Sequence, residues 1–235
     1  MNVNTGIKQA LILAIGIIVL GFFVDSGLKS LAGKDRKVVV KGLAEKEVEA
    51  DKVTWPILSK ELGDDLPELY QKINATTNKI RKFLIANGVK DNEIIVNAPV
   101  VIDLNAERYG ANQQPYRYNI TSIITVTSKN VNLVRSIISR QGDLLKQGVA
   151  IVDGGYENPV KYEYVAFRQL IPKMMQEAIE DAQVTAEQFA KNSDSKIDKI
   201  MNADQGQFSI EDRDSNTPYI KKVRVVTTVT YSLKD

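Results

Sequence analysis

The chain opens with an unbroken apolar run and then changes to alternating and helically spaced patterns. Ala10–Val24 holds 15 residues without a polar side chain, and Asp25 ends the run. Beyond a polar linker at residues 33–37, apolar residues recur at every second position in several segments, which is typical of strands with one buried face. In other segments they recur every three to four positions, which indicates amphipathic helices.

Two extended segments follow the linker. Residues 38–41 alternate, and so do residues 53–57, with Glu49-Ala50-Asp51 expected as the turn between them. Pro56 has no N–H to donate to a ladder, so we expect the second strand to lie at a sheet edge or to be bulged.

A first helix is predicted from Asp65, an acidic N-cap followed by Pro67 and Glu68, to the stop signal Asn87-Gly88. Residues 94–102 and 116–126 then alternate on either side of the polar segment 104–115. Together they predict a long hairpin.

Ser128 is expected to cap a second helix that ends near Gln141-Gly142, and residues 149–152 read as a short strand. A third helix is predicted over residues 170–192, with one stripe made of Ile171, Met174, Ala178, Thr185 and Phe189. Short extended pieces at 196–201 and 207–210 precede a strongly alternating strand at 223–231. Without the N-terminal run, the order is ββαββαβαβββ. This order predicts an α+β fold of mixed or antiparallel sheets with three helices on one face.

The N-terminal run allows three interpretations. With its flanks, residues 7–31, it is long enough for a transmembrane helix whose Lys8 and Lys29 reach the two interfaces. It also resembles a secretion signal, with Ser30-Leu31-Ala32 as a site for cleavage after Ala32. A buried core helix is the third possibility. The distance of Ala32 from the apolar run, with Lys29 in between, favours the retained anchor.

The expected organisation follows from this preference. Residues 1–36 would form a membrane anchor and linker, and residues 37–235 an α+β domain, with room for one large domain or two small ones. We expect a single-pass protein of the inner membrane with its domain in the periplasm, or a periplasmic or secreted protein if the segment is cleaved.

Composition removes several classes of function. The 31 basic and 29 acidic residues give a net charge of +2, so no overall field attracts nucleic acid. The chain has no Cys, which excludes disulfides, thiol nucleophiles and thiolate metal sites. It also has no His, which excludes a Ser-His-Asp triad and removes the commonest transition-metal ligand. We therefore expect no metal and no cofactor.

Three stretches together resemble the SIMPL-domain family of bacterial envelope and secreted proteins. They are "VVVKGLAEKEVEADKVTWPILSKEL", in which Gly42 ends a strand and Ala50-Asp51 forms a turn, then "AIEDAQVTAEQFA", and finally "KVRVVTTVTYSL". The second stretch carries the small and acidic helix residues Ala178, Asp181, Ala182, Ala186 and Ala190. The resemblance covers residues 37–234 and implies an opening hairpin, no agreed enzymatic activity, and links to the cell envelope, stress tolerance and oligomeric assembly.

The acidic residues give only weak evidence for metal binding or acid–base catalysis. Residues 212–216 have D-x-D-x-N spacing, but Thr217 and Val223 stand where a calcium loop needs Gly and Glu. Asp64-Asp65 is better explained as helix capping. Glu177, Glu180 and Asp181 are better explained as exposed charge than as an acid–base pair.

Four aromatic residues are the candidates for a partner or oligomer surface: Trp55, Tyr109, Tyr116 and Tyr118. Packing in the core and sheet is the simpler interpretation. The alternative is that the polar segment 104–118 binds a partner, as long loops with aromatics often do.

The leading hypothesis is therefore a non-enzymatic, membrane-anchored periplasmic protein that acts through self-assembly, as a homo-oligomer, or through an unknown protein partner. Carriage of a small ligand is an alternative, and a hydrolase that uses two carboxylates is a third.

Overall fold

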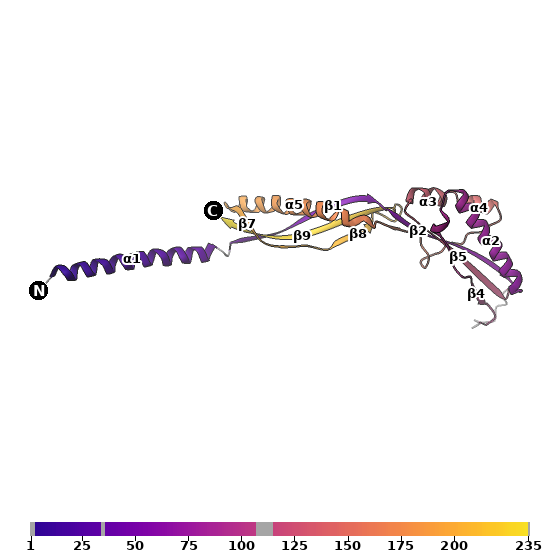
Figure 1. Cartoon of the computed structure of the whole chain (residues 1–235), viewed down its shortest axis with the longest axis horizontal. Coiled ribbons are helices and arrows are strands. Elements are labelled where there is room, and N and C mark those ends of the chain that lie inside the picture. Colours follow the sequence, from indigo (N-terminus) through magenta and orange to yellow (C-terminus); the bar gives the residue numbers. More distant parts are fainter. Residues whose placement is uncertain (1–2, 34–35, 107–114, 235) are drawn as a thin grey trace. The chain divides into compact units, whose positions relative to one another are not determined.

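The computed structural model describes residues 3–33, 36–106 and 115–234, and, within the first helix, the side chains of residues 11–27 (Figure 1). The helices are α1 (Val3–Gly33), α2 (Leu66–Ala86), α3 (Val131–Ile138), α4 (Gly142–Lys146) and α5 (Ile171–Asn192), with short 3-10 turns η1 (Asp91–Glu93) and η2 (Ala166–Gln169). The strands are β1 (Lys37–Glu49), β2 (Lys52–Gly63), β3 (Ile94–Val96), β4 (Val100–Asp103), β5 (Tyr118–Ser128), β6 (Lys161–Glu163), β7 (Lys196–Asp204), β8 (Phe208–Asp212) and β9 (Ile220–Lys234).

The chain divides into two compact units, each built from segments that are distant in sequence. The first, called unit 1, contains residues 1–46, 170–209 and 224–235. The second, unit 2, contains residues 47–169 and 210–223. Strands β1, β8 and β9 contribute residues to both units.

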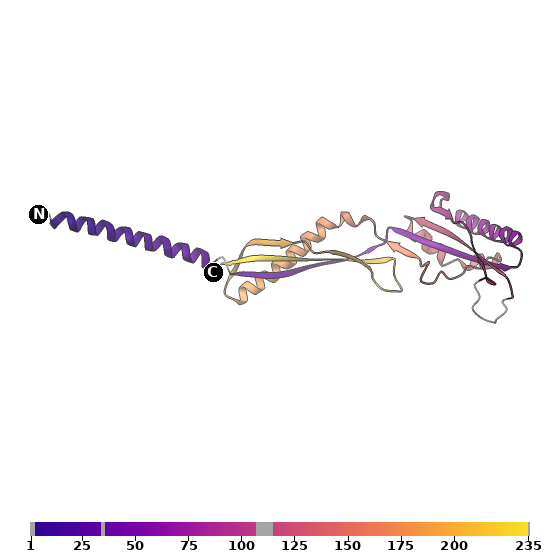
Figure 2. The same cartoon turned by 90° about the horizontal axis from the view of Figure 1, so that it is seen from below.

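Besides α1, unit 1 contains a sheet and the long helix α5. The strand order is β1-β9-β7, and β8 also pairs with β9. Helix α5 lies along this sheet in both views (Figure 1 and Figure 2). Every second residue of β1 from Val40 to Ala44 is buried, and Ala182 and Ala186 of α5 pack against Val40 and Tyr231.

The interface between α5 and the sheet is made of small side chains. Its buried residues are Met174, Ala178, Ala182, Ala186 and Ala190, each at most 1% exposed. The i, i+4 spacing places these alanines in one row on the helix. Since alanine has little volume, the helix backbone approaches the strands closely.

Gly42 of β1 is required at the closest point of this approach. A Cβ atom at this position would lie 1.8 Å from the carbonyl oxygen of Ala178 and 2.7 Å from the backbone nitrogen of Ala182. Both neighbours are backbone atoms of α5, so a rotamer change cannot relieve the clash. The resemblance implied that Gly42 ends a strand, which is wrong, because Gly42 lies inside β1 and is a packing requirement there.

Unit 2 is a five-stranded antiparallel sheet covered by helices. Its order is β3-β5-β2-β6, and β4 also pairs with β5. The register of β2 and β5 runs from Val53 opposite Ser128 to Gly63 opposite Tyr118. Large side chains fill its core, including Trp55, Ile57, Ile80, Leu84, Ile124, Val134, Ile137 and Leu144.

Several sequence expectations are confirmed. The fold is α+β with antiparallel pairing, and β3 and β4 both pair with β5, as the predicted hairpin requires. The carboxylate of Asp65 accepts the N–H of Glu68 at 2.9 Å and caps α2. The expectation that Pro56 places its strand at an edge or in a bulge is wrong, because β2 lies between β5 and β6 and its register with β5 is continuous. Pro56 is accommodated because the β2–β6 ladder stops at Thr54.

Other expectations were wrong in detail. The expected strand 94–102 is two strands, interrupted around Pro99. The cap of α3 is Asn130, whose side chain accepts from Leu133, whereas Ser128 instead donates to Glu93. Residues 149–152 contribute one isolated bridge, between Val152 and Leu58, and Phe189 is 58% exposed instead of facing the sheet.

The opening hairpin implied by the resemblance is also absent. Strand β1 pairs with β9, whereas β2 pairs with β5 and β6, so the two strands belong to different sheets. Asp51 does not turn the chain back on itself. Its carboxylate accepts the backbone N–H groups of Val165 and Ala166, at 2.6 and 2.8 Å, and so holds the start of η2.

The N-terminal run forms a continuous helix, α1, and its described side chains are exposed, including Ile18 and Phe22 at 71% each. Counted over the residues that the structure describes, no helix is both long and apolar enough to cross a membrane. The expected transmembrane helix over residues 7–31 is therefore not supported.

Candidate interaction surface

The four aromatic candidates do not form one surface. Trp55 is 3% exposed and lies in the core of unit 2, opposite Val126. This burial agrees with the packing interpretation and removes Trp55 from any contact surface. Tyr109 lies outside the described residues. Tyr116 is 45% exposed and Tyr118 is half-buried.

Tyr118 lies at the C-terminal end of the polar segment 104–118, where packing and Arg117 hold it in place. Its side chain packs on the small cluster of Leu69, Ile73 and Ile120, and the Arg117 guanidinium carbon lies 4.8 Å from its ring centroid. Arg117 also pairs with Asp103 at 3.0 Å, and this hydrogen bond lowers the pKa of Asp103. The structure thus fixes the base of the segment but leaves the partner-surface hypothesis untested.

The outer edge of β1 in unit 1 is partly closed by a side chain of α5. Leu43 donates its backbone N–H to the Asp181 carboxylate at 2.9 Å. An unpaired edge N–H is a template for another strand, so this carboxylate blocks one position of the edge. Asp181 therefore has a structural role that its helical spacing alone did not predict.

Strand β7, on the other side of β9, is irregular. Its pairing with β9 shifts register between Ile197 and Ile200 and again between Ile200 and Asn202. Such bulges twist an edge away from regular pairing. Both outer strands are thus poor templates for simple ladder extension.

Large apolar side chains are nevertheless exposed on these same strands. Val39 and Leu43 of β1 are 57% and 42% exposed, and they alternate with residues that face α5. Ile200 and Met201 of β7 are 52% and 53% exposed. We call these four residues the unit 1 apolar edges. They offer side-chain contact area where the backbone ladder is blocked.

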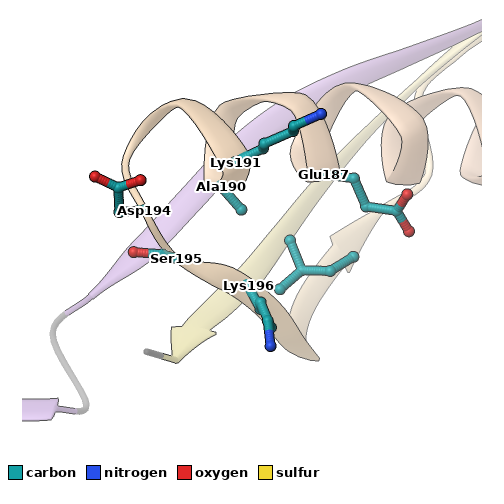
Figure 3. A pocket seen from close by; sticks show the side chains of 7 residues that line it. Glu187, Ala190, Lys191, Asp194, Ser195 and Lys196 are labelled. Carbon is teal, nitrogen blue, oxygen red and sulfur yellow. The ribbon is translucent and has the colours of Figure 1, made fainter.

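A depression of about 510 Å³ lies where α5 ends and β7 begins, lined by residues that include Glu187, Lys191, Asp194 and Lys196. In Figure 3 the charged ends of Glu187, Lys191 and Asp194 point away from one another. The Glu187 carboxylate accepts instead from the Gln183 side chain, one turn earlier on α5, at 2.9 Å. The arrangement does not resemble a catalytic site.

The depression follows from how α5 terminates. Asp194 adopts φ 51°, and the N–H of Ser195 returns to the carbonyl of Ala190 at 2.9 Å, which closes the helix with a Schellman motif. The Arg36 guanidinium donates to the Ser195 hydroxyl at 2.7 Å and fixes the first turn after the helix. The hollow is the space left by this cap.

The D-x-D-x-N segment is a turn with internal hydrogen bonds. The Asp214 carboxylate accepts the backbone N–H groups of Asn216 and Thr217, both at 2.8 Å, and also the Thr217 hydroxyl. Hydrogen bonds from Thr217 and from Arg213 lower the pKa of Asp214 to about 2. Among the described residues, no group of three acidic side chains is arranged to hold a metal ion.

Sequence reasoning identified Asp51 and Asp181 as motif residues but missed what they bind. Each carboxylate accepts backbone N–H groups from a segment more than 100 residues away in sequence. The sequence does show an acidic residue next to small residues at both positions. This pattern does not identify a hydrogen-bond donor more than 100 residues away in sequence.

A family model described as SIMPL, protein of unknown function (DUF541), matches residues 38–231. The matched range includes parts of both units and the motif residues Gly42, Asp51 and Asp181. No curated protein matches the chain.

Proposed function

Since this chain belongs to the SIMPL family, we propose that it acts without catalysis, by associating with copies of itself or with a partner protein in the cell envelope. The observation that supports this proposal is the exposure of Val39, Leu43, Ile200 and Met201 on the two outer strands of unit 1. Each of these strands exposes two large apolar side chains, and exposed apolar surface commonly marks protein contacts.

The blocked edges define how association would occur. Asp181 occupies the Leu43 N–H, and β7 is bulged, so a continuous intermolecular sheet is disfavoured. Contact through side chains avoids both obstacles. Two different edges that meet head to tail would give a ring or a filament, depending on whether the rotation closes.

Sedimentation of the full chain in detergent micelles tests self-association. The double variant Val39→Lys, Ile200→Lys should lower the protein mass per particle, because it places two charges in the contact. The matched control is Val184→Lys, which alters a side chain 60% exposed on α5 and should leave the mass unchanged. A monomeric wild type at high concentration, or equal effects of both variants, contradicts the proposal.

The N-terminal helix supports a location in the envelope. Its apolar side chains from Leu11 to Val24 are exposed, and a helix that is apolar on all sides is normally covered by lipid or protein. We place this helix at the inner membrane, with the two units in the periplasm. Copies held at one surface would meet at a high effective concentration.

Fractionation of cells tests this placement. The protein should sediment with membranes, resist salt extraction, and be degraded by protease once the outer membrane is opened. Sequencing of its N-terminus distinguishes a retained helix from cleavage after Ala32. Recovery in the cytosolic fraction, protected from protease, contradicts the placement.

A further inference from the structure

Unit 2 contains a second depression, of about 510 Å³, that none of the preceding arguments use. It is formed by α3, by β6 and by the segment just before β9. Its walls carry Ile138, Val160 and Pro218, and its rim carries the polar residues Ser139, Ser215 and Asn216. The hollow is shallow and open to solvent, so a ligand in it would stay partly exposed.

Three side chains from distant parts of the sequence meet in this depression. The guanidinium carbon of Arg135 lies 3.2 Å from the ring centroid of Tyr219. The ring of Tyr162 meets that of Tyr219 edge to face, with the centroids 6.2 Å apart. A stacked arginine keeps its in-plane N–H groups available, so the fork remains able to bind an anion.

The charge of Arg135 is not balanced by an acid at this position. Of the described residues that line the depression, Arg135 alone is charged. Its Nη1 donates to the uncharged Asn132 side chain at 3.4 Å, and its guanidinium stacks on the Tyr219 ring. The Tyr162 hydroxyl stays protonated because burial raises its pKa, so it adds a donor and no negative charge.

The backbone around these side chains is already fixed. The carbonyl of Tyr219 accepts the N–H of Ala50 at 2.8 Å, and Tyr162 is paired with Val53 in the β2–β6 ladder. The Asp214 turn holds Asn216 on the rim. A ligand would therefore meet a preformed site and would not have to order it.

We propose that this depression binds a carboxylate carried on an aromatic or branched apolar group, with Arg135 receiving the carboxylate and Tyr162 and Pro218 flanking the apolar part. A single guanidinium fork matches the two oxygens of a carboxylate. The apolar walls favour an organic acid over inorganic phosphate, which such walls do not solvate. The carboxylate could belong to a free acid or to the C-terminal residue of a peptide.

Calorimetric titration of the full chain in detergent micelles tests the proposal. The probes are phenylacetate, the peptide Ala-Ala-Phe with a free C-terminus, and the same peptide amidated. The free peptide should bind at least tenfold more tightly than the amide. Binding of phenylacetate as well assigns the site to free acids, whereas binding of the peptide alone assigns it to C-termini, and both outcomes support the site. Equal affinity for acid and amide, or no saturable heat with either acid, overturns it.

Variants locate the binding. Arg135→Gln should lower the affinity for the acid probes at least tenfold. The control Arg140→Gln changes an exposed arginine outside the depression and should alter the affinity less than twofold. Because Arg135 also packs on Tyr219, a second variant is Asn216→Asp, which adds a carboxylate on the exposed rim and should weaken binding without loss of thermal stability. If Arg140→Gln weakens binding as much as Arg135→Gln, or Asn216→Asp binds as wild type, the assignment is wrong. This inference does not depend on self-association through unit 1.

Discussion

The two units bury their cores by opposite means. In unit 1, α5 reaches the sheet because Gly42 and a row of alanines leave room for its backbone. In unit 2, the helices are separated from the sheet by large side chains such as Trp55, Ile80 and Leu84, all nearly inaccessible. Unit 1 should therefore be sensitive to added volume and unit 2 to removed volume, which the following substitutions can test.

The largest effect is expected from removal of the largest core side chain. Trp55→Ala leaves a cavity under α2 and α3 and should destabilise unit 2 by about 3–5 kcal/mol. Hydrogen exchange of unit 2 amides measures the loss. The control Tyr70→Ala removes an aromatic ring that is 53% exposed and should cost less than about 0.5 kcal/mol. Comparable exchange in the two variants would mean that the core does not depend on Trp55.

Addition of one methyl group tests the opposite case in unit 1. Gly42→Ala forces a Cβ atom into the backbone of α5 and should destabilise unit 1 by about 2–3 kcal/mol. Gly142→Ala, where a new Cβ meets nothing within 4 Å, is the matched control and should be neutral or slightly stabilising. Exchange of α5 amides is the measurement, and an unchanged rate in Gly42→Ala would show that the helix can move away at little cost.

The sequence anticipated this contrast only in part. Alternation and helical spacing predicted the long elements that bury one face, such as α2, α5, β5 and β9, but they did not predict α4 as a separate helix after α3. The same reasoning placed Phe189 on the buried face of α5, since a large apolar residue is expected inside. The close contact near Gly42 leaves room for alanine but not for phenylalanine, so the face of the helix with the small residues is the buried one.

The pairing of the strands and the candidate binding site were harder to predict from the sequence. Ala50-Asp51 reads as a hairpin turn locally, yet the Asp51 carboxylate binds residues 165 and 166 instead. Arg135, Tyr162 and Tyr219 have no local pattern in common, because the fold brings together α3, β6 and the segment just before β9. Contacts of this kind depend on chain topology, and the local periodicity of apolar residues does not encode topology.

A smaller effect is expected at the edge of unit 1. Asp181→Ala removes the acceptor of the Leu43 N–H and should cost about 1 kcal/mol, because water replaces part of the lost bond. It should also increase association by exposing a free edge donor. Glu180→Ala, which changes the adjacent carboxylate on α5, is the control. A more stable or less associated Asp181→Ala protein would contradict the edge-blocking role.

In unit 2, removal of a buried hydroxyl should stabilise the core instead. The Ser59 hydroxyl is buried without a hydrogen-bond partner in the described structure, so Ser59→Ala should gain up to about 1 kcal/mol. Ser122→Ala should cost a similar amount, because the Ser122 hydroxyl bonds that of Thr77 at 3.1 Å. Calorimetric melting of both variants measures the difference. The same sign for both would refute the distinction.

The smallest expected effect is a loss of stability at low pH. The pKa of Asp214 is lowered, so the stability it contributes is present above its ordinary value near 4 and is lost as the pH falls toward about 2. Carbon-detected titration of the Asp214 carboxyl should give a midpoint near 2, and Thr217→Val should raise it. A midpoint close to the ordinary value would show that the turn does not hold the carboxylate.

The buried position of Trp55 has one more consequence. It is the one tryptophan in the chain, and it lies in the core of unit 2, shielded from water. Its fluorescence should therefore be blue-shifted in the folded protein and should move to the red when unit 2 opens. The emission would not change if unit 1 alone opened. A melting curve recorded at tryptophan wavelengths therefore reports the unfolding of unit 2.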